Sequence, residues 1–471
     1  MTATPTTTTT VPADASSLRG LCGGAVHLPG DPGYDSARMP WNVAVDQRPA
    51  AVAYPASAEE VVEVVRAAKA AGLRVAAQGT GHNPAPLGPL DDVVLVRTSA
   101  MREVSVDADA LVARAGAGAL WEEVVDVVSP LGLYALHGSS PDVGVAGYSL
   151  GGGMGWFVRE LGLQTNNLTA IELVTPDAEL RRVDAGNDPE LFWALRGGGG
   201  NFGVVTALEF RVFPITDVYA GWLVWEVDKA REVLTRWVEW SETAPEQVTT
   251  AFRVLAFPPI DEIPEPFRGR TLVVINGSVH DDDATAERIL APLRELAPTM
   301  DTFARVPTTA LIRLHMDPEG PTPGVSGTAT MREMPAEAVD AFLANGPRDG
   351  SSLLLSELRQ LGGAVARPHP GAGALTHFDG KFIFFTAAIA ATPEDLARGA
   401  DEANALVEAL RPWTNGRQYL NFAEQETDVS TFWRPEAYAR LQTVRAQVDP
   451  DGLMVSNHEV PAATVPTQRE V

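Results

Sequence analysis

The sequence predicts an α+β protein with two domains. Short strands alternate with amphipathic helices over residues 40–215, and longer strands separated by helices follow Pro214. The 471 residues suffice for two or three folding units, each able to bury its own core. We therefore expect a first domain at 21–215, a second at 216–412, and a terminal segment at 413–471 that packs back on the first.

In the first domain, helix and strand signals follow each other closely. Ser57 and Glu60 have the spacing of a capping box, which predicts a helix over 58–72. A second amphipathic helix is expected over 119–132. The strands predicted around these helices cover 51–55, 73–78, 91–98, 111–116, 169–176 and 204–214.

The second domain has longer apolar runs, which predict a larger sheet. Helices are expected over 231–243 and 283–296. The predicted strands cover 222–227, 250–257, 271–280 and 381–390. In the terminal segment, YLNF at 419–422 is followed by a predicted helix over 435–450.

Composition and charge exclude several classes of partner. The formal net charge of −25 argues against nucleic acid or an anionic membrane as a partner. Cys22 is the only cysteine, so no intrachain disulfide can form, and we predict no metal site. The Thr- and Ala-rich start lacks the basic and apolar regions of a signal peptide, so we expect a disordered tail at 1–20 and a cytoplasmic protein.

Three segments concentrate glycine, at 79–82, 138–155 and 196–203. Glycine allows positive φ and close backbone approach, so several such loops in one domain favour a large phosphate-bearing ligand, a dinucleotide. The alternative is that each is a set of tight turns. We expect residues 138–155 to be mostly loop. No Gly-Lys-Ser/Thr of a P-loop is present, and the best Rossmann candidate, at 115–123, lacks the third glycine.

Four motifs then match a known family in order and spacing. They are GTGH, GxxxxxGVxG followed by GGGxG, ALRGGGGNFGVVT, and YLNF…DPDGLM…NH. The sequence thereby resembles FAD-linked oxidases of the berberine-bridge-enzyme type, which have the vanillyl-alcohol-oxidase/PCMH flavoprotein fold. The resemblance covers 40–215 and 417–460, and ELRQLGGAVAR at 357–367 is similar to a segment of the substrate domain. It implies a PCMH-type FAD-binding domain and an α/β substrate domain whose large antiparallel sheet is covered by helices.

The resemblance implies a covalent flavin. His82 stands where the family joins a histidine to the 8α-methyl group of the flavin, although a turn histidine is the alternative interpretation. Ser140 stands where many relatives carry the cysteine of a second link, so a single link is expected. The remaining residues expected to bind the cofactor are Gly79, Thr80, Gly81, Asn83, Gly138, Ser139, Gly144, Gly147, Tyr148, Gly152, Asn421 and Asn457.

Two positions bear on the chemistry that the resemblance implies. Val143 occupies a gatekeeper position, where valine goes with oxidases; the alternative is an ordinary core valine. Tyr419 matches the tyrosine placed over the N5 edge of the flavin, and as a base it requires a lowered pKa. Asn421 is expected on the same side of a strand as Tyr419. Met154 stands where several relatives carry a second catalytic tyrosine, which argues against a mechanism with two tyrosines.

The substrate is expected to contact Glu357, Arg359 and Gln360. Strand alternation places Glu357 and Arg359 on one face and Gln360 on the other, and the first two have a structural ion pair as their alternative. The expected reaction is hydride transfer from an alcohol, an amine or a secondary-metabolite hydroxyl to flavin N5, with O2 as the final acceptor and H2O2 as a product. The alternatives are a dehydrogenase with another acceptor, or a non-redox cyclase or binding protein that keeps FAD structurally.

Overall fold

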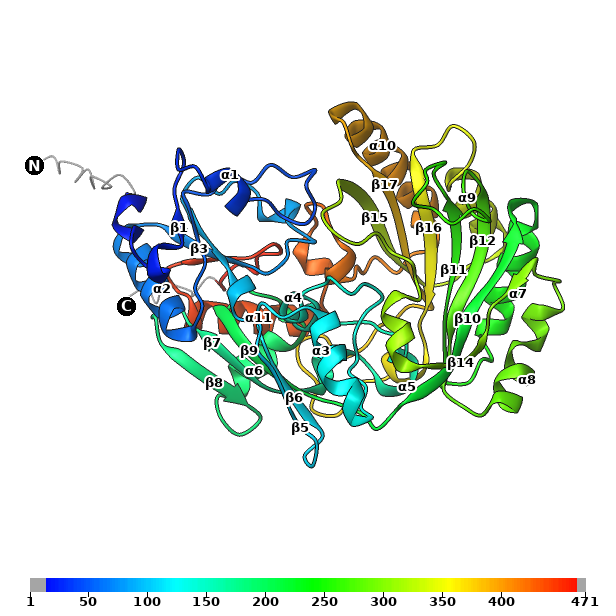
Figure 1. The fold of residues 1–471 in the computed structure, drawn as a ribbon, viewed down its shortest axis with the longest axis horizontal. Coiled ribbons are helices and arrows are strands. Elements are labelled where there is room, and N and C mark those ends of the chain that lie inside the picture. Colours follow the sequence, from blue (N-terminus) through cyan, green and yellow to red (C-terminus); the bar gives the residue numbers. More distant parts are fainter. Residues whose placement is uncertain (1–13, 464–471) are drawn as a thin grey trace, which may run out of the picture.

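A computed structural model describes residues 14–463 and shows two lobes side by side (Figure 1). The first lobe contains two five-stranded sheets, and the second contains one eight-stranded sheet. This mixed arrangement confirms the predicted fold class. No helix among residues 14–463 combines the length and the apolar character needed to cross a bilayer.

The first sheet is mostly parallel and carries the first glycine loop. Its strand order is β1 (Val26–His27), β2 (Ala51–Ala53), β4 (Val93–Arg97), β3 (Arg74–Gln78) and β18 (Met454–Val455). Helix α2 (Ala58–Ala70) covers this sheet. Ser57 caps the N-terminus of the helix, and its hydroxyl accepts a hydrogen bond from the Glu60 N–H at 3.3 Å. The parallel pairing of β18 with β3 brings the C-terminal segment to the first lobe.

The predicted disordered tail is wrong for its last residues. Residues 1–13 lie outside the described part of the chain, but a 3₁₀ turn forms over Ala15–Leu18. The Leu18 side chain is fully buried in the core beneath α2. Burial of this leucine against the first sheet orders the segment, a contact that local composition does not reveal.

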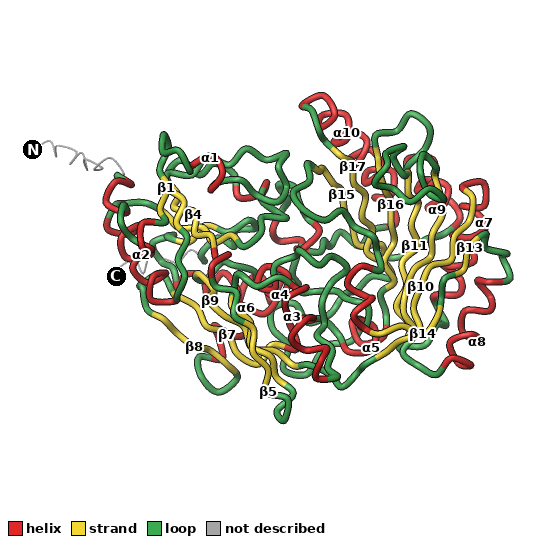
Figure 2. The backbone as a smooth tube through the Cα atoms, viewed as in Figure 1, coloured by secondary structure: helices red, strands yellow, loops and turns green. Residues whose placement is uncertain are grey.

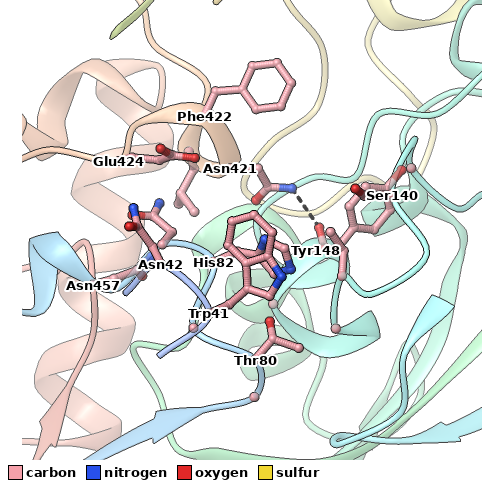
Figure 3. A pocket seen from close by; sticks show the side chains of 18 of the residues that line it. Trp41, Asn42, Thr80, His82, Ser140, Tyr148, Asn421, Phe422, Glu424 and Asn457 are labelled. Carbon is pink, nitrogen blue, oxygen red and sulfur yellow. Dashed lines mark hydrogen bonds between the residues drawn. The ribbon is translucent and has the colours of Figure 1, made fainter. Parts of the chain in front are cut away.

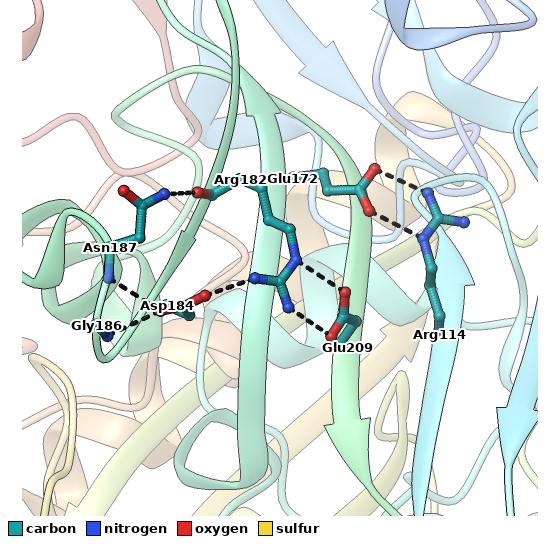
Figure 4. Close-up of polar contacts among 7 residues, drawn as sticks. All are labelled: Arg114, Glu172, Arg182, Asp184, Gly186, Asn187 and Glu209. Carbon is teal, nitrogen blue, oxygen red and sulfur yellow. Dashed lines mark hydrogen bonds and ion pairs between the residues drawn. The ribbon is translucent and has the colours of Figure 1, made fainter.

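The second sheet is antiparallel and has one charged face. Its order is β5 (Val104–Asp107), β6 (Val112–Gly116), β9 (Val204–Arg211), β7 (Leu168–Val174) and β8 (Leu180–Asp184). Figure 4 shows two ion pairs on this face, Arg114 with Glu172 and Arg182 with Glu209, each joined by two hydrogen bonds. Such exposed pairs contribute about 0–1 kcal/mol each, so the stability of the sheet comes mainly from its apolar face.

Helices lie against the apolar core of this sheet. They are α3 (Trp121–Val128), α6 (Pro189–Gly198) and α11 (Pro435–Val448), and their buried side chains share one core with the strands. The turn from β6 into α3 takes up the glycines at 116 and 118, where a Cβ would lie 2.3 Å and 2.1 Å from backbone oxygens. These oxygens belong to Met101 and Thr98 in the segment after β4, and the close approach of that backbone leaves no room for a side chain at either glycine.

The second lobe is an antiparallel sheet covered by helices on one face. Its order is β13 (Met300–Asp301), β10 (Asp217–Glu226), β12 (Thr271–Val279), β11 (Val248–Ala256), β16 (Leu353–Gln360), β17 (Phe382–Ile389) and β15 (Gly324–Met331), with β14 (Ala304–Pro307) beside β10. Figure 2 shows its helices on the outer side; they are α7 (Ala230–Ser241), α8 (Asp283–Arg294), α9 (Ala336–Asn345) and α10 (Pro393–Leu410). The opposite face of the sheet points toward the first lobe.

One local expectation is confirmed and another is corrected. The segment 138–155 is mostly loop, as expected, and contains one short helix, α4 (Val145–Leu150), whose Val145 and Leu150 side chains are buried in the core of the first lobe. This packing outweighs the helix-breaking tendency of glycine. Leu420–Phe422 is a 3₁₀ turn and not a strand. The domain boundaries themselves remain predictions.

Candidate cofactor and substrate site

A cavity of about 430 Å³ lies between the lobes. This volume is within the range of roughly 300–1,000 Å³ that is typical of small-molecule and cofactor sites. Residues of all three glycine loops line it, together with the C-terminal segment and the free face of the large sheet. All predicted site residues except Gly152 and Gln360 are among its lining residues.

His82 lies in the first glycine loop, directly after β3. Gly81 has a φ of +83°, and a Cβ there would lie 2.8 Å from the Pro40 side chain, so only glycine fits. The imidazole is stacked on the Trp41 indole, with ring centroids 4.0 Å apart (Figure 3). Burial lowers the pKa of His82, and Asp142 opposes that effect. His82 is therefore held as a neutral imidazole at the cavity wall.

The second glycine loop and α4 form another side of the cavity. Ser140 is buried there, and Gly147 has open space where a Cβ would be. The Tyr148 hydroxyl is buried without a hydrogen-bond partner among the described residues. The backbone carbonyl of Tyr148 accepts a hydrogen bond from Asn421 Nδ2 at 3.0 Å. Gly152 does not line the cavity; it has a φ of +136°, and a Cβ there would lie 2.9 Å from the Tyr419 ring.

Tyr419 is buried at the inner end of the cavity. Its hydroxyl oxygen accepts hydrogen bonds from the Gly153 N–H and from Asn421 Nδ2, both at 3.0 Å. Two donors occupy both lone pairs, so the phenolic proton must point away from them. Burial raises the pKa of Tyr419, and this effect outweighs Gly153, Arg359 and Asn421, which lower it. A base at this position requires a lowered pKa, and Tyr419 does not have one in the protein without a bound cofactor.

These features suit a dinucleotide. Several lining glycines leave the backbone open to close approach, Gly147 and Gly200 most clearly. Some residues that line the cavity have buried polar atoms without partners in the described chain, among them Asn83 Oδ1 and the Tyr148 hydroxyl. Within residues 14–463, no group of three or more His, Cys, Asp and Glu side chains is placed to hold a metal ion.

Comparison with known proteins shows similarity to FAD-linked enzymes. Residues 49–184 match an FAD binding domain. The chain is 29% identical to (R)-6-hydroxynicotine oxidase of Paenarthrobacter nicotinovorans, over 93% of this chain and 96% of that protein. The chain is thus an FAD-linked oxidoreductase, similar over nearly its whole length to this flavoprotein oxidase.

Solved structures share the fold of this chain. BBE-like 1 of Physcomitrella patens superposes with a TM-score of 0.82 at 19% identity, over 93% of this chain and 97% of that one. Glucooligosaccharide oxidase of Acremonium strictum superposes with a TM-score of 0.80 at 23% identity, over 95% of this chain and its whole length. That enzyme is described with a 6-S-cysteinyl, 8α-N1-histidyl FAD.

In this oxidoreductase, the free face of β16 carries a buried ion-pair network. Glu357 Oε1 accepts from Arg359 Nε at 2.6 Å, and its Oε2 lies 3.2 Å from His315 Nε2 and 3.4 Å from Arg253 Nε. Burial opposes ionisation of Glu357, but Arg359, His315 and Arg253 outweigh it and hold the pKa of this carboxyl well below its usual range. Glu357 thus forms the ion pair that the sequence left open, and it is a poor proton acceptor.

Gln360 lies on the other face of β16, as the alternation indicated. Its Oε1 accepts from the Thr250 hydroxyl at 2.9 Å, and its Nε2 donates to the Ser241 carbonyl at 3.1 Å. Both partners belong to the side that the helices cover. The prediction that Gln360 contacts substrate is therefore corrected, because its polar atoms are engaged away from the main cavity.

The sequence analysis missed Glu424, which lines the same cavity (Figure 3). Ser326 donates its hydroxyl to Glu424 Oε2 at 2.7 Å, and no Lys, Arg or His of the described chain lies within ion-pair distance. Burial raises the pKa of Glu424 to about 7, while Ser326 opposes this rise. A carboxyl that titrates near neutrality in a cavity is a candidate functional group. Its position just after YLNF was the one available sequence signal.

Proposed function

We propose that this chain is an oxidase whose FAD is joined to the protein once, through His82. The observation that carries the proposal is the place of His82 on the first glycine loop at the wall of the cavity, with Ser140 in place of a second attachment residue. Serine lacks the thiolate that a thioether link requires. The proposed substrate is a small or medium organic molecule with an alcohol or amine group, and O2 is the proposed acceptor.

The cavity residues divide into two proposed groups. Backbone N–H groups of the glycine loops would hold the phosphates, and Tyr148, Asn83, Asn421 and Asn457 would contact the ring system. Bound FAD would supply the hydride acceptor. Arg359 would orient the substrate, since its guanidinium borders the cavity and is fixed at Nε by Glu357.

A proton must leave the substrate as the hydride is transferred, and two side chains compete for it. The Tyr419 oxygen is held by two N–H donors, which stabilise a phenolate once it forms. Glu424 has one oxygen free of protein partners and a pKa of about 7, near the value at which a general base is most effective. We propose Tyr419 as the acceptor on its family position, and Glu424 as the alternative on its pKa.

The covalent link is tested by acid precipitation of purified protein. The precipitate should stay yellow, and peptide mass spectrometry should find one FAD on the peptide that contains His82. His82→Ala should release its flavin into the supernatant. Two flavin bonds, or none, in the wild-type protein would overturn the single link.

The reaction type is tested by anaerobic bleaching with a panel of alcohols, amines and sugars. An oxidase loses its yellow colour with substrate and regains it in air, with formation of H2O2. A dehydrogenase bleaches but recovers slowly in air, whereas a protein that keeps FAD structurally bleaches with none of the panel.

A further inference from the structure

The contacts of His82 determine which ring nitrogen is free. Nε2 lies 3.2 Å from the backbone carbonyl oxygen of Asp142. A carbonyl oxygen can only accept, so Nε2 must carry the hydrogen. The lone pair of the neutral ring is then on Nδ1. The contact of Nε2 with the Asp142 carbonyl and the stacking on Trp41 hold the ring in this orientation, so Nδ1 is the nitrogen available to form a bond.

The Asp142 side chain faces the same imidazole. Its Oδ2 accepts from Trp41 Nε1 at 2.7 Å and from the Gly320 N–H at 2.8 Å, which fixes the carboxylate between the two lobes. Its Oδ1 is buried, has no hydrogen-bond partner, and lies 3.7 Å from His82 Nε2. Among the described residues, His82 is the only group within ion-pair distance of this carboxylate that can become a cation.

We propose that Asp142 is a positioning residue for covalent attachment of the flavin, stabilising the positive charge that the His82 ring gains as Nδ1 forms its bond. This inference rests on the proposed link through His82. The carboxylate oxygen without a partner lies where that charge appears. Trp41 has two functions here, because its indole holds the imidazole by stacking and holds the carboxylate by hydrogen bonding.

The atoms and electrons of the attachment reaction balance when O2 is the oxidant. A bond forms between Nδ1 and the 8α-carbon while one C–H bond of that methyl group breaks. Two electrons remain in the flavin ring and pass to O2. One proton comes from the methyl group and the other from Nε2 beside Asp142, and together they complete H2O2.

The experiment measures attachment and not turnover. Each variant is purified from riboflavin-starved cells, mixed with FAD in air, and denatured in acid at intervals, and the fluorescence that stays with the protein is recorded. Asp142→Asn keeps the size of the side chain and an acceptor for Trp41 but removes the charge. We expect attachment to slow by at least about tenfold, because a charge lost within 4 Å of a partly buried cation costs more than about 1.4 kcal/mol.

The matched control is Asp92→Asn, the same substitution at an aspartate of the first lobe that pairs with Arg74 at the surface and does not line the cavity. It should attach flavin at the wild-type rate. If Asp142→Asn does so too, Asp142 has no role in attachment although the link through His82 stands. If the wild-type protein forms no bond, the proposed link itself fails. Should Asp142→Asn not fold, Asp142→Glu compared with Asp142→Gln tests the same charge, and equal rates in that pair would overturn the inference.

Discussion

The Tyr419 hydroxyl connects the C-terminal segment to the second glycine loop, because it accepts hydrogen bonds from Asn421 and from Gly153. Tyr419→Phe removes the only acceptor of the Gly153 N–H in the described contacts and one acceptor of the Asn421 amide. A buried donor left without a partner costs about 1–3 kcal/mol, so the free energy of unfolding should fall by that amount. If the hydroxyl is also the proton acceptor, flavin reduction should slow by about 10²–10⁴-fold in stopped-flow traces.

Met154 provides the control for Tyr419, since it lies in the same apolar cluster and has no proton to exchange. Met154→Leu keeps the volume and should reduce flavin at close to the wild-type rate. Reduction of Tyr419→Phe at the wild-type rate would transfer the role of base to Glu424.

Glu424 gives the protein a pH dependence of known sign. Its pKa is about 7 in the folded protein and near 4.5 in the unfolded chain. Between these values the folded state binds more protons than the unfolded one, so stability falls as pH rises through this range. Glu424→Gln lacks this dependence. The Tm of the variant minus that of the wild-type protein should be larger at pH 8 than at pH 5, and an equal difference at both would contradict the raised pKa.

Val143 tests access of oxygen to the cavity. Its side chain lines the cavity and packs against the core of the first lobe, so its position is compatible with both interpretations that the sequence allowed. Val143→Ile adds one methylene and should slow reoxidation by O2 roughly tenfold or more, while reduction by substrate changes little. Val145→Ile adds the same group in the buried side of α4 and should reoxidise normally. Equal rates of reoxidation in the two variants would mean that Val143 contributes only to packing.

At the scale of elements, α4 contains Gly147 and is capped by Gly151, and these two glycines have different surroundings. A Cβ at Gly147 would meet no protein atom within 4 Å, whereas one at Gly151 would lie 1.7 Å from Asn421 Oδ1. Gly147→Ala should therefore keep or raise stability, by up to about 1 kcal/mol, because alanine favours the helix. It should also lower the flavin content, measured by the ratio of visible to ultraviolet absorbance, if the cofactor approaches this backbone.

Gly151→Ala is the contrasting variant, because its Cβ collides with the C-terminal segment. Overpacking costs about 1–3 kcal/mol, so this protein should lose stability with or without flavin. Full flavin content in Gly147→Ala would mean that the cofactor does not approach α4 at this glycine.

At the scale of the whole molecule, Arg159 joins the two lobes. It lies on α5 (Val158–Leu161) and is buried, and its guanidinium donates to the carbonyls of Ala244, Pro245, Val248 and Leu361. Hydrogen bonds from a charged donor contribute roughly 1.5–3 kcal/mol each. Arg159→Met should therefore lower the free energy of unfolding in urea by about 3 kcal/mol or more.

Arg398→Met is the matched control for Arg159, since Arg398 lies exposed on α10 and forms only a surface ion pair. It should change stability by less than about 0.5 kcal/mol. Similar losses of stability in both variants would show that the hydrogen bonds from Arg159 to these carbonyls do not hold the lobes together.

Local signals in the sequence determined the elements and the type of ligand. The capping box at Ser57, the alternating strands and the glycine clusters depend on neighbours within a few residues, and the motif order pointed to FAD and to His82. Such signals state which backbone a segment favours. They also indicated that Glu357 and Gln360 point to opposite faces of one strand, because that follows from the period of the pleat.

Only the tertiary structure decided how the site side chains are charged and held. Burial and distant partners set their pKa values: Arg253 lies about a hundred residues before Glu357, and the carbonyl that orients His82 belongs to Asp142. The same holds for α4, which forms because Val145 and Leu150 find a core, and for Glu424, whose raised pKa comes from its place in the cavity. Desolvation and Coulomb energies depend on distance in space, and a sequence read alone specifies only distance along the chain.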